Sequence, residues 1–240
     1  MSIVFWEKQD GVALIQMNNG QNLQNLEFAR AMNTTIDEAI ADTEVCAMVL
    51  TSTDEKFFSN GIDVEWLGSR FADKAYPAIK DFCYGMDAVF KKCLLAPVPV
   101  IAAINGHAFG NGAIIACACD FRFMKSDRGF FCFPEVDLGI PFLPGMDAFI
   151  EKAIPQYKLN ELKLTGKRAT APELAEHHVI EKACDNHTHL MAETMAFARS
   201  FQKKRGIFAE HKYRMYKHII AIIDNENPEH IEPLNLMIQE

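Results

Sequence analysis

The stretch PVPVIAAINGHAFGNGAIIACACDFRFM, residues 97–124, decides the fold of this chain. It begins as an apolar strand, passes through a glycine-rich turn at 106–112, and continues into a short helix and another strand. The next apolar segment, RGFFCFPEVDLGIPFLPG at residues 128–145, holds the carboxylate of Glu135 among apolar residues. The glycine-rich turn followed by this carboxylate indicates a turn that stabilises negative charge and one general base, both serving a single site.

A second turn of the same plan lies earlier, in FFSNGIDVEWL at residues 57–67. A strand over 48–51 is predicted to lead through Ser59, Asn60 and Gly61 into a helix. Such a turn presents unpaired backbone N–H groups at the positive end of a helix, and glycine lets the backbone approach a ligand. Taken singly, either turn is equally typical of a mere connection, but two that face each other would hold an oxyanion.

Strands and helices alternate around these turns, which predicts an α/β fold with β/α layering. Helical periodicity prevails after residue 155, where TAPELAE is predicted to start a helix with Thr170 as N-cap and Glu173 at capping-box spacing. We expect a β/α core over residues 1–190. A mostly helical region over 191–240 is expected to pack on that core or on a neighbouring subunit.

Composition limits the kinds of ligand. The chain has 240 residues, of which 49% are hydrophobic, and a net charge of −8, which disfavours nucleic acid and anionic membranes as partners. No apolar run reaches the length of a membrane span, no secretory signal is recognised, and the last residues are not a peroxisomal tripeptide. Seven cysteines without metal-ligand spacing predict buried thiols and no metal. We therefore expect a cytoplasmic protein.

Glu135 follows a proline and is predicted to be a desolvated base. Its neighbours suggest an apolar shell, which would make the carboxylate a stronger base for taking a proton from carbon. The proposed shell consists of Phe130, Phe131, Phe133, Val136 and Leu138. The alternative is an ordinary surface acid at the start of a turn. A nicotinamide enzyme is disfavoured, because GHAFGNG does not have the dinucleotide-binding spacing.

The chain resembles the crotonase, or enoyl-CoA hydratase/isomerase, superfamily over roughly residues 10–190. The resemblance rests on the two turns, the PEVDLG segment at 134–139 and the run at 165–182. The resemblance implies a spiral of ββα units, a trimer or dimer of trimers, and an acyl-CoA thioester substrate with no separate cofactor. It also implies that the backbone N–H groups of Ile62 and Asn111 bind the thioester carbonyl. Asn111 stands where the family usually has glycine.

The chain departs from the family pattern at one catalytic position. The resemblance implies two glutamates in a hydratase, and this chain has Ile114 at the first position and Glu135 at the second. Adding water across a double bond needs both carboxylates, whereas moving the bond from C3 to C2 needs one base. The segments at 56–67 and 127–140 are also similar to those of Δ3-Δ2-enoyl-CoA isomerases, so we predict an enoyl-CoA isomerase acting in fatty acid metabolism.

The remaining assignments each have an alternative. Core packing is the competing role for every residue predicted to contact the acyl chain, namely Trp66, Leu67, Phe71, Ile114, Phe142 and Leu143. The loop at 18–25 lacks the lysine that the family often uses for CoA phosphates, which leaves Lys56, Lys91, Lys92 and the cluster at 203–205, or a solvated basic face. His107 is predicted to be structural or to approach the ligand.

Two other functions stay open at this stage. One is a CoA-thioester enzyme of another kind, such as a hydratase that recruits Asp63 or Glu65 as its second acid, or a hydrolase with one base. The other is a binding protein of the same fold without turnover, including a nucleic-acid binder, which the acidic net charge disfavours.

Overall fold

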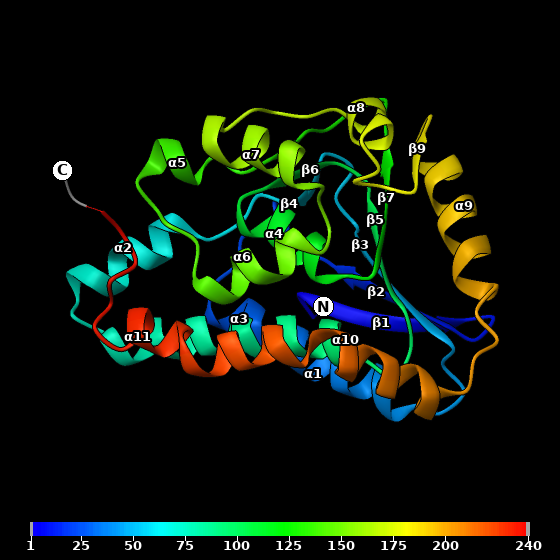
Figure 1. Ribbon diagram of the computed structural model, residues 1–240, viewed down its shortest axis with the longest axis horizontal. Helices are drawn as coiled ribbons and strands as arrows, with labels where there is room; N and C mark the ends of the chain where they lie inside the picture. The colour runs from blue at the N-terminus through cyan, green and yellow to red at the C-terminus, as the bar shows by residue number, and fades with distance from the viewer. Residues whose placement is uncertain (1, 239–240) are drawn as a thin grey trace.

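The structure, a computed structural model, describes residues 2–238 and contains two β-sheets (Figure 1). The larger sheet has the order β1-β2-β3-β5-β7-β9 and is parallel except for the β1–β2 pair. Its strands are β1 Val4–Gln9, β2 Val12–Met17, β3 Ala47–Ser52, β5 Val100–Ile104, β7 Phe121–Lys125 and β9 Lys182–Cys184. The smaller, parallel sheet consists of β4 Phe57–Ser59, β6 His107–Phe109 and β8 Phe131–Cys132.

The chain passes three times from the larger sheet to the smaller sheet and then into a helix. The three units are β3-β4-α2, β5-β6-α4 and β7-β8-α5, with α2 at Val64–Ala72, α4 at Asn111–Ala118 and α5 at Glu135–Leu138. Each strand pairs with its counterpart in the next unit, so the units stack as successive turns of one spiral. The predicted α/β spiral of ββα units is confirmed.

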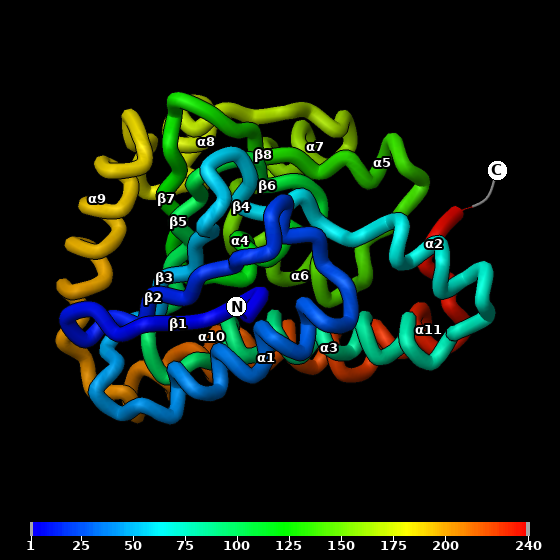
Figure 2. The backbone as a smooth tube through the Cα atoms, turned by 180° about the vertical axis from the view of Figure 1, so that it is seen from behind, coloured from blue at the N-terminus to red at the C-terminus, as the bar shows by residue number. Residues whose placement is uncertain are grey.

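Both faces of the inner strands β3 and β5 are buried, which explains their continuous apolar runs. Every residue of β3 is buried, and alternate side chains of β3 and β5 enter two different hydrophobic clusters. One cluster lies under α9, His187–Arg199, which covers one side of the sheet (Figure 2). The other contains α1, Leu26–Ala41, and α3, Tyr76–Leu95.

Successive turns of the spiral touch backbone to backbone at glycines. A Cβ on Gly106 would lie 2.2 Å from the carbonyl oxygen of Lys56, and one on Gly112 would lie 2.2 Å from that of Ser59. No other residue fits there without moving the backbone. The short strands β4, β6 and β8 are not predicted from the sequence, because strands of two or three residues have no measurable periodicity.

The C-terminal region returns to the core rather than forming a separate unit. Its remaining helices are α6 Pro144–Glu151, α7 Gln156–Thr165, α8 Ala171–Glu176, α10 Arg205–Asn225 and α11 Asn227–Ile231. α10 runs along α3 and α6 (Figure 1), and its buried Lys212 donates to Asp120 at 2.6 Å and to the carbonyl of Cys93 at 2.8 Å. The predicted boundary at residue 190 falls inside α9, His187–Arg199.

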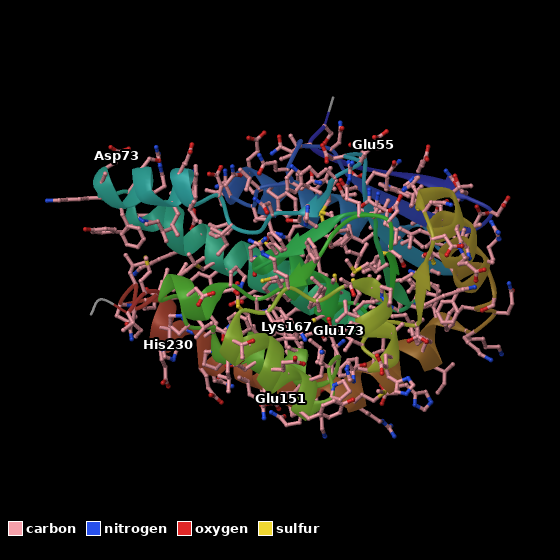
Figure 3. All side chains as sticks on the ribbon, turned by 90° about the horizontal axis from the view of Figure 1, so that it is seen from above. Glu55, Asp73, Glu151, Lys167, Glu173 and His230 are labelled. Carbon is pink, nitrogen blue, oxygen red and sulfur yellow. The ribbon has the colours of Figure 1, made fainter. Side chains whose placement is uncertain are left out.

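The predicted capping box of α8 is also wrong. Thr170 is the N-cap residue by position, but its side chain makes no capping hydrogen bond. Glu173 instead forms ion pairs with Lys158 and with Lys167, which lies beside it in Figure 3. Two lysines compete successfully for the carboxylate, because charge-assisted hydrogen bonds are stronger than a bond to a neutral backbone N–H.

The cysteines are arranged as the composition predicts. All seven cysteines are free thiols, and Cys93, Cys117, Cys119, Cys132 and Cys184 are buried. Within residues 2–238, no cluster of three His, Cys, Asp or Glu side chains is arranged to hold a metal ion. None of the helices in the same range combines the length and apolar character that a bilayer crossing requires.

The glycine contacts predict a large stability difference between two Gly→Ala substitutions. Gly106→Ala places a methyl group against the Lys56 backbone and is expected to lower the free energy of unfolding by about 2–4 kcal/mol. Gly68→Ala, in α2 with open space around the site, is the control and is expected to raise it by up to about 1 kcal/mol. Urea denaturation measures both, and equal effects would contradict the backbone contact.

Candidate active site

Two residues that line an apolar cavity have backbone N–H groups without an acceptor among residues 2–238. The cavity, about 90 Å³, is lined by both Ile62 and Asn111. Within residues 2–238, neither of their backbone N–H groups donates a hydrogen bond to the protein. Unpaired donors at the edge of a cavity are the expected arrangement for binding an oxyanion.

Gly61 brings the two turns together. Its φ of 82° lies in the left-handed region, and a Cβ there would be 2.7 Å from the carbonyl oxygen of Phe109 and 3.2 Å from the backbone nitrogen of Asn111. Only glycine combines this φ with so close an approach. The donors of Ile62 and Asn111 therefore lie on adjacent backbone segments, although 48 residues separate them along the chain.

The second donor lies at the N-terminus of α4, and the opposite end of that helix is capped by cations. Lys152 Nζ donates to the carbonyl oxygens of Cys117 at 2.8 Å and Cys119 at 2.9 Å. Arg122 Nη1 also donates to Cys119, at 3.0 Å. These contacts satisfy carbonyls that the helix leaves unpaired, while its dipole favours negative charge beside Asn111.

Glu135 lies directly beside the second turn. Its Oε1 would be 2.9 Å from a Cβ on Gly110, whose φ of 52° also favours glycine. Gly110 directly precedes the donor residue Asn111, so the carboxylate and the oxyanion donors border the same space. The structure thus brings together the base and both donors that the sequence analysis selected.

Burial raises the pKa of Glu135 from 4.5 to about 7, because the carboxylate is desolvated. Its Oε2 is buried and has no hydrogen-bond partner among the described residues, while the positive charge of Lys163 partly opposes the rise. The predicted shell is wrong in part. Val136 and Leu138 are 50% and 54% exposed, because α5 turns them outward.

The apolar surroundings of Glu135 come from the cavity, whose lining combines five segments of the chain. Of the residues predicted to contact the acyl chain, Leu67, Ile114, Phe142 and Leu143 line it. Trp66 and Phe71 do not; their rings pack on Phe82 and Tyr76. The lining also includes residues that sequence reasoning missed, namely Val64, Phe82, Cys83, Met86, Ile140, Pro141, Met146, Leu236 and Met237.

The other candidate groups lie elsewhere or are occupied. Asp63 caps α2 by accepting from the backbone N–H of Trp66, and Glu65 is exposed. His107 stacks among Phe57, Phe109 and Phe130 and lies outside the cavity, and burial lowers its pKa. Lys91 and Lys92 form ion pairs with Asp224 and Asp37, and Arg205 donates to backbone carbonyls.

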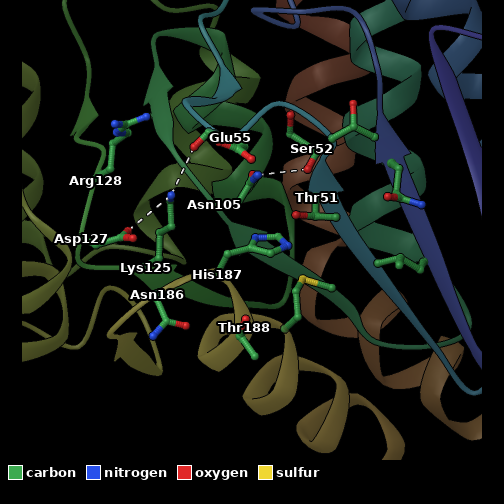
Figure 4. Close-up of a pocket in the computed structure, with 14 residues that line it drawn as sticks. Thr51, Ser52, Glu55, Asn105, Lys125, Asp127, Arg128, Asn186, His187 and Thr188 are labelled. Atoms are coloured by element: carbon green, nitrogen blue, oxygen red, sulfur yellow. Dashed lines mark hydrogen bonds and ion pairs between the residues drawn. The ribbon is translucent and has the colours of Figure 1, made fainter.

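A larger cavity of about 740 Å³ lies where β3, β5 and β7 end, beside the first turn of α9 (Figure 4). Its lysine is already engaged, since Lys125 Nζ donates to the carbonyl oxygen of Glu55 at 3.2 Å and lies 3.4 Å from Asp127. None of the predicted site residues lines this cavity. Chemistry rather than size therefore assigns the candidate site to the smaller cavity around Glu135.

Known proteins are similar to this chain in sequence and in fold. Residues 7–229 match the sequence profile of the family described as enoyl-CoA hydratase/isomerase. Enoyl-CoA delta isomerase 3 of Arabidopsis thaliana is 28% identical over 198 residues, which cover 79% of this chain and 81% of that protein. The short-chain-enoyl-CoA hydratase of Clostridium acetobutylicum is 31% identical over 186 residues, 76% and 69% of the two chains. The crystal structure of enoyl-CoA hydratase from Bacillus halodurans superposes with a TM-score of 0.86 at 21% identity, covering 96% and 93%.

The raised pKa of Glu135 predicts a pH-dependent stability. Between pH 4.5 and about 7 the folded protein holds a proton that the unfolded chain has lost, so folding stability falls as pH rises through this window. Glu135→Gln removes the effect, and the variant is expected to gain up to roughly 3 kcal/mol over the wild type between pH 4.5 and 8. Denaturation series across pH measure it, with Glu65→Gln as an exposed control. Parallel curves for wild type and Glu135→Gln would contradict a buried carboxylate.

Proposed function

The chain belongs to the enoyl-CoA hydratase/isomerase family, and on that premise we propose that it moves the double bond of an enoyl-CoA from C3 to C2. The observation that carries this proposal is the composition of the cavity around the base. Among residues 2–238, Glu135 is the sole carboxylate that lines it, and Ile114 lines the same cavity. The site therefore offers one proton-transfer group and two oxyanion donors.

The proposed reaction needs only these groups. The ionised Glu135 takes a proton from C2, and the electron pair of the broken C–H bond moves into the C1–C2 bond. The thioester oxygen gains negative charge, and the N–H groups of Ile62 and Asn111 bind it in the dienolate. Glu135 then returns the proton at C4, the C1 carbonyl re-forms, and the double bond lies between C2 and C3.

The energy of the oxyanion hydrogen bonds and the pKa of Glu135 both suit a proton shuttle. One oxyanion donor typically contributes about 3–4 kcal/mol to transition-state binding in enzymes that form such anions. A carboxylate whose pKa is about 7 can both accept and return a proton near neutral pH, as a shuttle must. The apolar lining keeps bulk water from the dienolate, which strengthens both effects.

Hydration is the second candidate, and the name of the Clostridium acetobutylicum relative favours it. A hydratase site must hold a water molecule and activate it with a second carboxylate. Asp63 is committed to capping α2 and Glu65 is exposed, and neither lines the cavity. We therefore rank isomerisation first. The expected trimer or dimer of trimers and the cytoplasmic location stay predictions.

Binding without turnover is the weakest candidate. A buried carboxylate oxygen without a partner costs free energy, and a protein that only binds an acyl chain gains nothing from it. The same group beside two oxyanion donors is useful when a proton must leave carbon.

Glu135→Gln is the first test of the proposal. It is expected to lower kcat for the conversion of 3-enoyl-CoA to conjugated 2-enoyl-CoA by about 10²- to 10⁴-fold, because the proton acceptor is lost. Conjugation is followed by ultraviolet absorbance. Asp137→Asn, an exposed acid of the same helix, is the matched control and should leave kcat unchanged.

Two results of this assay would overturn the proposal. One is isomerisation that survives Glu135→Gln. The other is wild-type formation of 3-hydroxyacyl-CoA from 2-enoyl-CoA at a rate that rivals isomerisation.

The pH dependence of the rate is a second, independent prediction. Because only the ionised Glu135 can accept a proton, kcat/KM for 3-enoyl-CoA is expected to rise with pH and to reach a plateau above about pH 7. Steady-state rates between pH 5 and 9 measure this profile. A rate already at its plateau at pH 5 would exclude a desolvated Glu135 as the base.

A further inference from the structure

We propose that Gln24 is a positioning residue that holds the two oxyanion donors, Ile62 N–H and Asn111 N–H, at a fixed separation. The inference rests on the proposed function, because it concerns how the same site binds a thioester oxygen. Gln24 lies in the polar loop between β2 and α1, does not line the cavity, and is completely buried. A buried glutamine at that place needs a use for all of its hydrogen-bonding groups.

The backbone of Gln24 holds the first turn on both sides of Ile62. Its N–H donates to the carbonyl oxygen of Gly61 at 2.8 Å, and its carbonyl oxygen accepts from the N–H of Asp63 at 2.9 Å. Gln24 and Ile62 thereby form an isolated parallel bridge. The arrangement uses the groups on either side of the Ile62 N–H and leaves that donor free for a ligand.

The side chain of Gln24 holds the second turn. Its Oε1 accepts from Asn111 Nδ2 at 2.6 Å, and its Nε2 donates to Ser59 Oγ at 3.0 Å. Ser59 Oγ in turn donates to the carbonyl oxygen of Asn22 at 2.8 Å. One residue is therefore bonded through its backbone to the first donor segment and through its amide to the residue that carries the second donor.

The need for such a link follows from Asn111 itself. This residue replaces the glycine that the resemblance leads one to expect, and it is 2% exposed. Its Oδ1 has no partner among the described residues. Without Gln24, its Nδ2 would also lose its hydrogen bond, and the amide would be free to turn and shift the start of α4. A displacement of about 1 Å at a reacting group can cost about 100-fold in rate.

Gln24→Leu tests this role, because leucine keeps the backbone contacts and a similar volume while it removes the amide. We expect kcat for 3-enoyl-CoA isomerisation to fall about 10- to 100-fold with KM changed less than threefold, since oxyanion donors act mainly in the transition state. We also expect the infrared carbonyl stretch of bound butanoyl-CoA to shift less toward low frequency than in the wild type. A purely structural role would lower the melting temperature and leave the carbonyl stretch unchanged.

Matched variants keep the test decisive even where Gln24→Leu folds poorly. Asn111→Ala removes the same hydrogen bond from the other side, retains the backbone donor, and is expected to have a similar effect. The double variant should lose no more than the larger single loss, because both substitutions break one interaction. Gln21→Leu, in the same loop but exposed, is the control and should match the wild type.

Outcomes separate this inference from the proposed function. Unchanged kcat and carbonyl stretch in Asn111→Ala and in folded Gln24→Leu would overturn it, and so would losses that multiply in the double variant. A wild type that polarises bound butanoyl-CoA but does not isomerise 3-enoyl-CoA would refute the isomerase function instead. In that case the carbonyl stretch of the variants still decides the role of Gln24.

Discussion

The backbones of successive spiral turns approach each other so closely that only glycine fits between them. A Cβ on Gly106 would lie 2.2 Å from the carbonyl oxygen of Lys56 on the previous turn, and a Cβ on Gly112 would lie 2.2 Å from that of Ser59. These contacts stack the three short strands of the smaller sheet and bring the starts of α2 and α4 together. The spacing of the donors at Ile62 and Asn111 depends on that stacking, and so does any stabilisation of negative charge in the cavity.

The third turn of the spiral places Glu135, the proposed base, through the same constraint. α5 follows β8, and the Glu135 carboxylate rests against Gly110, where a Cβ would collide with Oε1. The chain covers the site from its other end as well. Leu236 and Met237 line the cavity, and the N–H of Ile238 donates to the carbonyl oxygen of Gly139 at 2.8 Å. The cavity around Glu135 is therefore lined by segments about 100 residues apart in sequence.

Several sequence predictions survive in the structure because they depend on residue type or local pattern. The strand expected over 48–51 corresponds to β3, every residue of which is buried. Other predictions failed where long-range contacts compete with local ones. Glu173 forms ion pairs with two lysines instead of a capping hydrogen bond. Trp66 and Phe71 pack against aromatic side chains and do not line the cavity.

By itself, the sequence determined the chemical inventory of the site: one glutamate at 135, isoleucine at 114, and glycines at 61, 106, 110 and 112. Those identities decide which proton transfers are available and where the backbone can come close, because they are properties of single residues. Only the tertiary structure decided that three strands of two or three residues pair, that Leu236 and Met237 line the cavity, and that Gln24 bonds to both turns. These features depend on contacts between residues far apart in the chain, and no local pattern records which distant groups will meet.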